Sequence, residues 1–128
     1  MTVRMTLLDN GLRVVTHEMA SVESASLGIW VGSGTRHEAD GSNGVAHLLE
    51  HMAFKGTERR SAQDIAFEIE AVGGHLNAYT GRESTAYFAK ILAPNIPLAA
   101  DILTDIIQNA TFEAVELERE RQVVLQEI

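Results

Sequence analysis

The chain contains 128 residues, of which 45% are hydrophobic and 22% are charged, with 10 Lys and Arg against 18 Asp and Glu. This length fits one domain with a single core, and the formal net charge of −8 argues against a nucleic-acid-binding protein. The absence of cysteine excludes disulfide scaffolds and Cys-ligated zinc sites. No stretch approaches the roughly 20 apolar residues of a membrane span, and no apolar stretch near the start is long enough for a signal peptide.

The N-terminal part of the chain predicts three strands. Residues 3–8 and 12–17 flank Asn10-Gly11, a pair that supplies the positive φ angles of a type I′ turn, so a β-hairpin is expected here. Residues 25–31 are an apolar run typical of a third strand. The polar residues 35–43 that follow predict a loop.

Two helices are expected after this loop. Residues 45–54 have helical periodicity, and Ser42 or Asn43 is the expected N-cap. Ser61 and Asp64 have the spacing of a capping box, which predicts the start of a second helix.

Two further strands and two further helices complete the predicted order. Strands are expected at residues 75–80 and 84–92, and helices at 96–108 and 113–128. The order βββ-αα-ββ-αα predicts an α+β fold, with a mainly antiparallel sheet and helices packed on one face. Because the last helix is still continuing where the chain stops, we expect residues 1–128 to be a single N-terminal domain of a longer protein.

His47, Glu50 and His51 carry the strongest chemical signal. Residues four apart on an α-helix lie on the same face, so both imidazoles can reach one cation. Two imidazoles and a nearby carboxylate suit zinc, which lowers the pKa of a bound water towards ~7 so that Glu50 can accept its proton. This H-x-x-E-H order is that of the inverted zincins. Solvated helices carry the same spacing by chance, but the apolar neighbours favour the metal interpretation, since burying these polar groups is costly without a ligand.

The last predicted helix offers a third protein ligand. Glu120 and Glu127 are seven residues apart, which places them two turns apart on nearly one face. The same face is interleaved with Arg119 and Arg121. From the residues alone, a solvated acidic surface is the favoured interpretation of this helix.

Several motifs resemble the pitrilysin/insulinase family of zinc peptidases. The strongest are His47-Leu-Leu-Glu-His51-Met-Ala-Phe-Lys-Gly-Thr57 and Glu120-Arg-Gln-Val-Val-Leu-Gln-Glu-Ile128. Further matches lie in the right order along the chain: Leu8-Asp-Asn-Gly-Leu-Arg-Val, Gly32-Ser-Gly-Thr-Arg and Leu76-Asn-Ala-Tyr-Thr-Gly-Arg-Glu-Ser-Thr85. Within the family, the likeness is greatest to the processing-peptidase branch, which comprises the mitochondrial processing peptidase β subunit and its bacterial relatives. The fold implied is the N-terminal part of a pitrilysin-type half domain.

The resemblance implies a role for each residue of the two motifs. His47, His51 and Glu127 match zinc ligands, and Glu50 matches the base that activates water. Glu120 matches a second catalytic carboxylate that supports the site without binding zinc tightly. The resemblance therefore reverses the interpretation of the last helix as a solvated surface.

The resemblance also implies a surface for an extended peptide. Asn77 and Ala78 match positions on an edge strand that hydrogen-bonds the substrate, and an unpaired strand edge can take up a peptide in this way. Phe54 matches a position that lines the pocket after the scissile bond. Without the resemblance, residues 77–80 are best interpreted as an ordinary strand end. For Phe54, core packing fits the sequence as well as a substrate pocket does.

These observations predict a zinc-dependent endopeptidase that hydrolyses extended peptides or presequences. The alternatives are a non-catalytic assembly or core subunit of the same family and a helical metal-binding module without chemistry; the intact His47/Glu50/His51/Glu127 set argues against the former. The resemblance implies that a distal half, or a homologous subunit in a homo- or heterodimer, supplies an Arg and a Tyr that bind the substrate. We expect a bacterial cytoplasmic location, with the mitochondrial matrix as the alternative.

Overall fold

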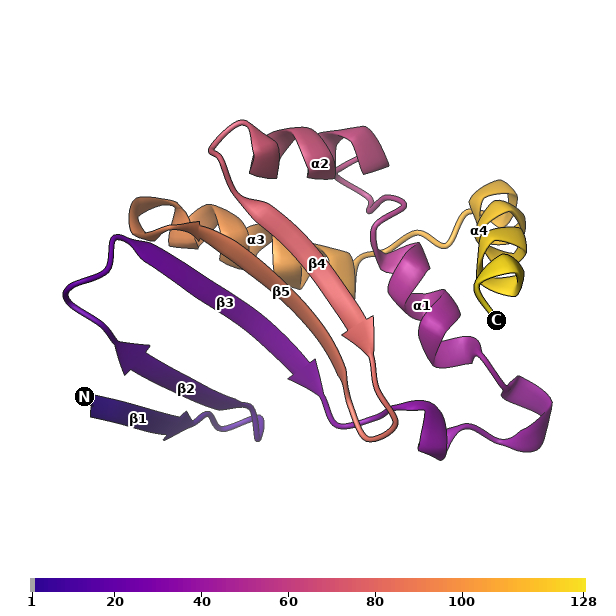
Figure 1. Cartoon of the computed structure of the whole chain (residues 1–128), viewed down its shortest axis with the longest axis horizontal. Helices are drawn as coiled ribbons and strands as arrows, with labels where there is room; N and C mark the ends of the chain where they lie inside the picture. Colours follow the sequence, from indigo (N-terminus) through magenta and orange to yellow (C-terminus); the bar gives the residue numbers. More distant parts are fainter. Residues whose placement is uncertain (1) are drawn as a thin grey trace.

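The computed structural model describes residues 2–128 and has an α+β architecture (Figure 1). Its strands are β1 (Thr2–Leu7), β2 (Arg13–Glu18), β3 (Ser24–Val31), β4 (His75–Thr80) and β5 (Thr85–Leu92). Strands β3, β5 and β4 form an antiparallel sheet in that order, whereas β1 and β2 form a separate antiparallel hairpin. The predicted, mainly antiparallel α+β fold is confirmed.

The helices lie between and after the strands. They are α1 (Val45–Ala53), α2 (Ala62–Glu70), α3 (Ile96–Gln108) and α4 (Ala114–Glu127). Short 3₁₀ turns at Thr35–His37 and Asp40–Ser42 occupy much of the predicted loop, and a third spans Ala93–Asn95. In Figure 1, α1 lies beyond the edge strand β4, and α4 packs against α1. Within residues 2–128, no helix combines the length and the hydropathy needed to cross a bilayer.

The core lies between α3 and one face of the sheet. Tyr87, Ala89 and Ile91 alternate along β5 and are buried in the same cluster as Ile102 of α3, as the two-residue period of a strand requires. On the opposite face of the sheet, Trp30 is 63% exposed. The helices therefore cover one face of the sheet, as predicted.

The β1–β2 connection differs from the predicted type I′ turn. Only Gly11 has a positive φ (+89°), whereas a type I′ turn needs two such residues. The side-chain oxygen of Asn10 instead accepts a hydrogen bond from the backbone N–H of Leu12 at 3.0 Å. The backbone N–H of Gly11 donates to the carbonyl of Leu8 at 2.9 Å, and that of Leu8 donates to the carbonyl of Leu12 at 2.8 Å, so the connection spans residues 8–12.

The beginning of α2 agrees with its sequence signal. The backbone N–H of Asp64 donates to Oγ of Ser61 at 3.0 Å, and the N–H of Ser61 donates to Oδ2 of Asp64 at 2.9 Å. The predicted capping box is therefore confirmed. The bounds of α3 also coincide with the predicted residues 96–108.

A buried carboxylate on α3 anchors the loop that follows α1. Asp105 is 1% exposed and accepts hydrogen bonds from Thr57 (2.7 Å), Arg60 (2.8 Å) and Asn109 (3.0 Å). Burial raises the pKa of Asp105, but these hydrogen bonds outweigh burial and lower it to about 2. Ionised Asp105 thereby ties residues 57–60 to the core.

We expect Asp105→Ala to lower the free energy of unfolding by roughly 3 kcal/mol, because it removes one partner of a buried ion pair. The folded-state pKa lies below the ordinary value of 3.8, so this stabilisation is complete well above pH 4 and is lost as the pH falls towards 2. Urea denaturation should therefore show a large wild-type advantage at pH 7 and a smaller one at pH 3. Asp101→Ala is the control, since that side chain is 47% exposed and its loss is expected to cost less than about 1 kcal/mol. Equal losses for the two variants would contradict the assignment.

Candidate active site

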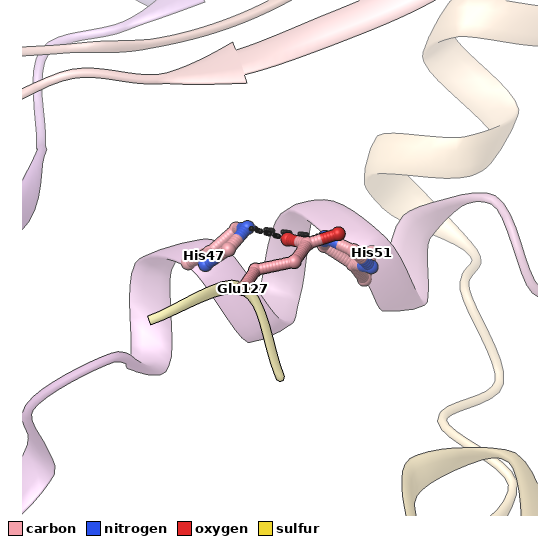
Figure 2. A group of neighbouring side chains, drawn as sticks. All are labelled: His47, His51 and Glu127. Carbon is pink, nitrogen blue, oxygen red and sulfur yellow. Dashed lines mark hydrogen bonds and ion pairs between the residues drawn. The ribbon is translucent and has the colours of Figure 1, made fainter. Parts of the chain in front are cut away.

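Two histidines and one glutamate converge between α1 and α4 (Figure 2). The Nε2 atoms of His47 and His51 lie 3.1 Å apart, and Oε2 of Glu127 lies 3.1 Å from the first and 3.5 Å from the second. These groups come from helices far apart in the sequence, and their ligand atoms all lie within 4.8 Å of one another. The structure thus brings together the three side chains predicted as metal ligands, in a group that could hold a cation.

The helical repeat of α1 places both imidazoles on one side. His47 and His51 are one turn apart, with ring centroids separated by 4.7 Å. The same helix buries Met52 and Ala53. Because these apolar residues are packed inside, α1 is held with its two histidines directed at α4.

Helix α4 presents its carboxylates in two different environments. Glu120 and Val124 are buried, whereas Glu127, two turns after Glu120, remains half exposed next to the histidines. Glu116 and Glu118 instead form surface ion pairs with nearby arginines. The solvated-surface interpretation therefore describes only part of this helix and is wrong for Glu120.

Glu120 is an ionised carboxylate that orients His51. Its Oε2 lies 2.9 Å from Nδ1 of His51, and its Oε1 lies 2.9 Å from Nζ of Lys55. Burial raises the pKa of Glu120, but the bonds with Lys55 and His51 outweigh burial and lower it below its usual value. Since an ionised carboxylate only accepts hydrogen bonds, Nδ1 of His51 is the donor. The other ring nitrogen of His51, Nε2, faces His47 and Glu127.

Glu50 lies beside this group rather than within it. The hydroxyl of Thr80 donates a hydrogen bond to its carboxylate. An open cleft of about 370 Å³ runs between α1 and β4, and its lining residues are Thr35, His47, Glu50, Ala78, Tyr79 and Thr80. Sequence analysis did not identify Thr80, although it shares a strand face with Ala78 two residues before it. Glu50 therefore faces an open cleft.

The predicted substrate-binding residues fall in two places. Asn77 and Ala78 lie on β4, which within residues 2–128 is an edge strand paired with β5 alone, and Ala78 lines the cleft next to Glu50. The N–H of Ala78 donates to the side-chain oxygen of Asn77 at 2.8 Å. Phe54 is not in this cleft: it lines a separate pocket of about 230 Å³ between α2 and the start of β4.

The N-terminus of α1 is capped by a residue that sequence analysis missed. The prediction of Ser42 or Asn43 as N-cap is wrong, because the N-cap is Gly44, which has no side chain and a φ of +90°. The carboxylate of Glu38 accepts hydrogen bonds from the N–H groups of Gly44 (2.6 Å) and Ala46 (3.1 Å). An acid at a helix N-terminus also complements the helix dipole. The sequence gives only a weak signal for this cap. Glycine at the N-cap has no side chain, and the acceptor, Glu38, lies six residues before it.

Known proteins share both the sequence and the fold of this chain. "Probable mitochondrial-processing peptidase subunit beta, mitochondrial" from Arabidopsis thaliana is 52% identical over 125 residues, covering 98% of this chain and 24% of that protein. The mitochondrial-processing peptidase subunit beta of Rattus norvegicus is 50% identical over 125 residues, covering 98% of this chain and 25% of that protein. The chain thus spans about a quarter of the length of these relatives.

Solved structures agree with the sequence relatives. A protease from Helicobacter pylori superposes with a TM-score of 0.92 at 29% identity, covering 98% of this chain and 30% of that one. Pitrilysin superposes with a TM-score of 0.88 at 28% identity, covering 98% of this chain and 14% of that one. Residues 13–128 match the insulinase family, peptidase family M16. The resemblance seen in the motifs is confirmed, and the chain belongs to the insulinase family of peptidases, M16.

Proposed function

We propose that this chain carries the catalytic metal site of a zinc-dependent endopeptidase. The observation that carries the proposal is the convergence of His47, His51 and Glu127 next to a cleft that Glu50 lines. Membership of a peptidase family supports the reaction class. Intact side chains at all four positions argue against the alternative of a non-catalytic assembly subunit.

The spacing of the three groups fits zinc. Zinc binds His nitrogen and carboxylate oxygen tetrahedrally at about 2.0–2.1 Å, so two of its ligand atoms lie about 3.3 Å apart. The separations among the atoms of His47, His51 and Glu127 are 3.1, 3.1 and 3.5 Å. Three protein ligands also leave the open position that is typical of catalytic zinc sites.

The proposed chemistry assigns one role to each group around the cleft. Zinc, when bound, supplies the Lewis acidity that makes water acidic near neutral pH. Glu50 accepts the proton that the attacking water loses, and Thr80 orients the carboxylate of Glu50 through its hydroxyl. Glu120 keeps His51 in the orientation that presents Nε2 to the site.

The proposed substrate is an extended peptide that adds to the edge of β4. Backbone groups at Asn77 and Ala78 would pair with the peptide, whose scissile bond would then lie in the cleft beside Glu50. Phe54 would line a pocket further along the same edge, for a side chain after the cleaved bond. The net charge of −8 suits basic peptides such as presequences.

The proposed setting is a larger assembly. Because the chain spans about a quarter of its relatives, we propose that the rest of such a polypeptide, or a homologous subunit, completes substrate binding. The relatives are named as subunits of mitochondrial-processing peptidases, which supports the mitochondrial matrix over the bacterial cytoplasm as the location.

Glu127→Gln is expected to weaken zinc binding by more than the roughly 10–100-fold typical of losing an outer-shell partner, because it removes a direct ligand. Native mass spectrometry after zinc reconstitution and buffer exchange should show one zinc per wild-type chain and none on the variant. The matched control is Glu118→Gln, since this exposed glutamate lies on the same helix and should leave zinc in place. A Glu127→Gln chain that retains zinc as the wild type does would refute this ligand assignment.

Glu50→Gln is expected to reduce peptide hydrolysis by about 10²–10⁴-fold without releasing zinc, because the amide cannot accept the proton from water. The assay uses the longest natural polypeptide that contains this chain, with a quenched fluorescent peptide rich in Lys and Arg, and Glu118→Gln as the control. Substantial turnover by the Glu50→Gln variant contradicts the role of Glu50 as the base. A wild-type protein that holds zinc, forms a stable complex and hydrolyses nothing would instead support the non-catalytic alternative.

A further inference from the structure

Glu120 has one partner for each of its carboxylate oxygens. Nζ of Lys55 lies 2.9 Å from Oε1, and Nδ1 of His51 lies 2.9 Å from Oε2. The residue is only 7% exposed, so bulk water does not readily replace a lost partner. Without Lys55, a buried, charged oxygen would lack a donor, which favours rotation of the carboxylate towards solvent and away from His51.

Lys55 lies in the loop that follows α1, and this loop contacts the segment before α4. It directly follows the C-cap of α1, and the N–H of Thr57 donates to the carbonyl of Arg60 at 2.8 Å. The N–H of Thr111 donates to the carbonyl of Gly56 at 3.1 Å. The first bond closes the loop on itself, and the second connects it to the segment that precedes α4.

The core fixes the same loop from the other side. The hydroxyl of Thr57 donates to buried Asp105 and accepts from the N–H of Arg60 at 3.0 Å, while the Arg60 guanidinium also bonds to Asp105. The loop that carries Lys55 is therefore anchored on α3, and its ammonium reaches across to α4. An ion pair fixed in this way costs less side-chain entropy than one between two mobile surface residues.

From these contacts we infer that Lys55 is a positioning residue of the site, which holds Glu120 against Nδ1 of His51 and so keeps Nε2 of His51 as the free ligand atom. The inference rests on the proposed function where it concerns zinc. The orientation and tautomer of His51, in contrast, are properties of the metal-free chain and can be measured without it.

The test uses Lys55→Met, which removes the charge but keeps an unbranched side chain. With ¹⁵N-labelled histidine, a long-range ¹H–¹⁵N spectrum of the metal-free chain reports the tautomer of each imidazole. We expect the wild type to hold His51 with its proton on Nδ1 and the variant to show a mixture of both tautomers. Lys55→Arg should restore the wild-type spectrum, because it keeps the charge and the donors. Lys90→Met, at the other lysine of the chain, which is exposed on β5, should leave the spectrum unchanged.

Zinc affinity, measured by competition with a chromophoric chelator, gives a second readout. We expect Lys55→Met to weaken binding about 10–100-fold, as for other outer-shell partners, with an unfolding midpoint close to that of the wild type. In a Glu120→Ala background, Lys55→Met should weaken binding no further, because Lys55 acts through Glu120. Lys55→Gln supports the same measurements if the methionine variant does not fold.

An unchanged His51 tautomer in Lys55→Met or Lys55→Gln would overturn the inference, as would an equal loss of zinc affinity in Lys90→Met. Additive effects of the Lys55 and Glu120 substitutions would overturn it as well. Failure of the proposed function has a different signature: Glu127→Gln would keep its zinc, while the tautomer of His51 would still depend on Lys55.

Discussion

The packing of α4 against α1 depends on one buried carboxylate. Taking an unpaired carboxylate out of water costs several kcal/mol, so the burial of Glu120 is tolerated because both of its oxygens have donors, His51 and Lys55. With Glu120 in place, two turns of helix carry Glu127 to the Nε2 atoms of the histidines. The bonds of Glu120 therefore both stabilise the helix pair and set the geometry of the candidate metal site.

Helix α1 is also fixed relative to the edge of the sheet. Glu38 caps its N-terminus, and the N–H of Thr35, just before that residue, donates to the carbonyl of Gly81 in the β4–β5 turn at 3.0 Å. Thr80, at the end of β4, bonds to Glu50 in the middle of the helix. These bonds connect the β4 end of the sheet to α1 and to the turn before it, on either side of the cleft.

Sequence reasoning succeeded where the signal is local. The capping box of Ser61 and the helical spacing of the H-x-x-E-H motif each involve residues within one turn, and both were predicted correctly. It failed where an element uses a partner from further away or an alternative bond. The cap of α1 comes from Glu38, outside the window that defines an N-cap, and the β1–β2 connection is closed by a bond from Gly11 to Leu8 that the two-residue turn did not predict.

The two glutamates of α4 show a different limit. Periodicity correctly placed Glu120 and Glu127 on one side of a helix, but it contains no information about what covers that side, so a solvated surface was the favoured interpretation from the residues alone. Only the resemblance to a family, which compares sets of residues from distant motifs, indicated that His51 and its helix lie opposite these glutamates. Phe54 illustrates the converse, since the resemblance implies a substrate pocket there, whereas the side chain lines a separate pocket beside α2.

Every donor group of the candidate site lies in a chain that spans about a quarter of its relatives. Glu120 bonds to both His51 and Lys55, and Thr57, two residues after Lys55, bonds to Asp105 of the core. Each step in this series is a bond between described residues of this chain, so contacts within residues 2–128 support the orientation of the candidate ligand His51. Preorganisation of this kind is what a metal site requires, because ligands that are already oriented lose little entropy when the ion binds.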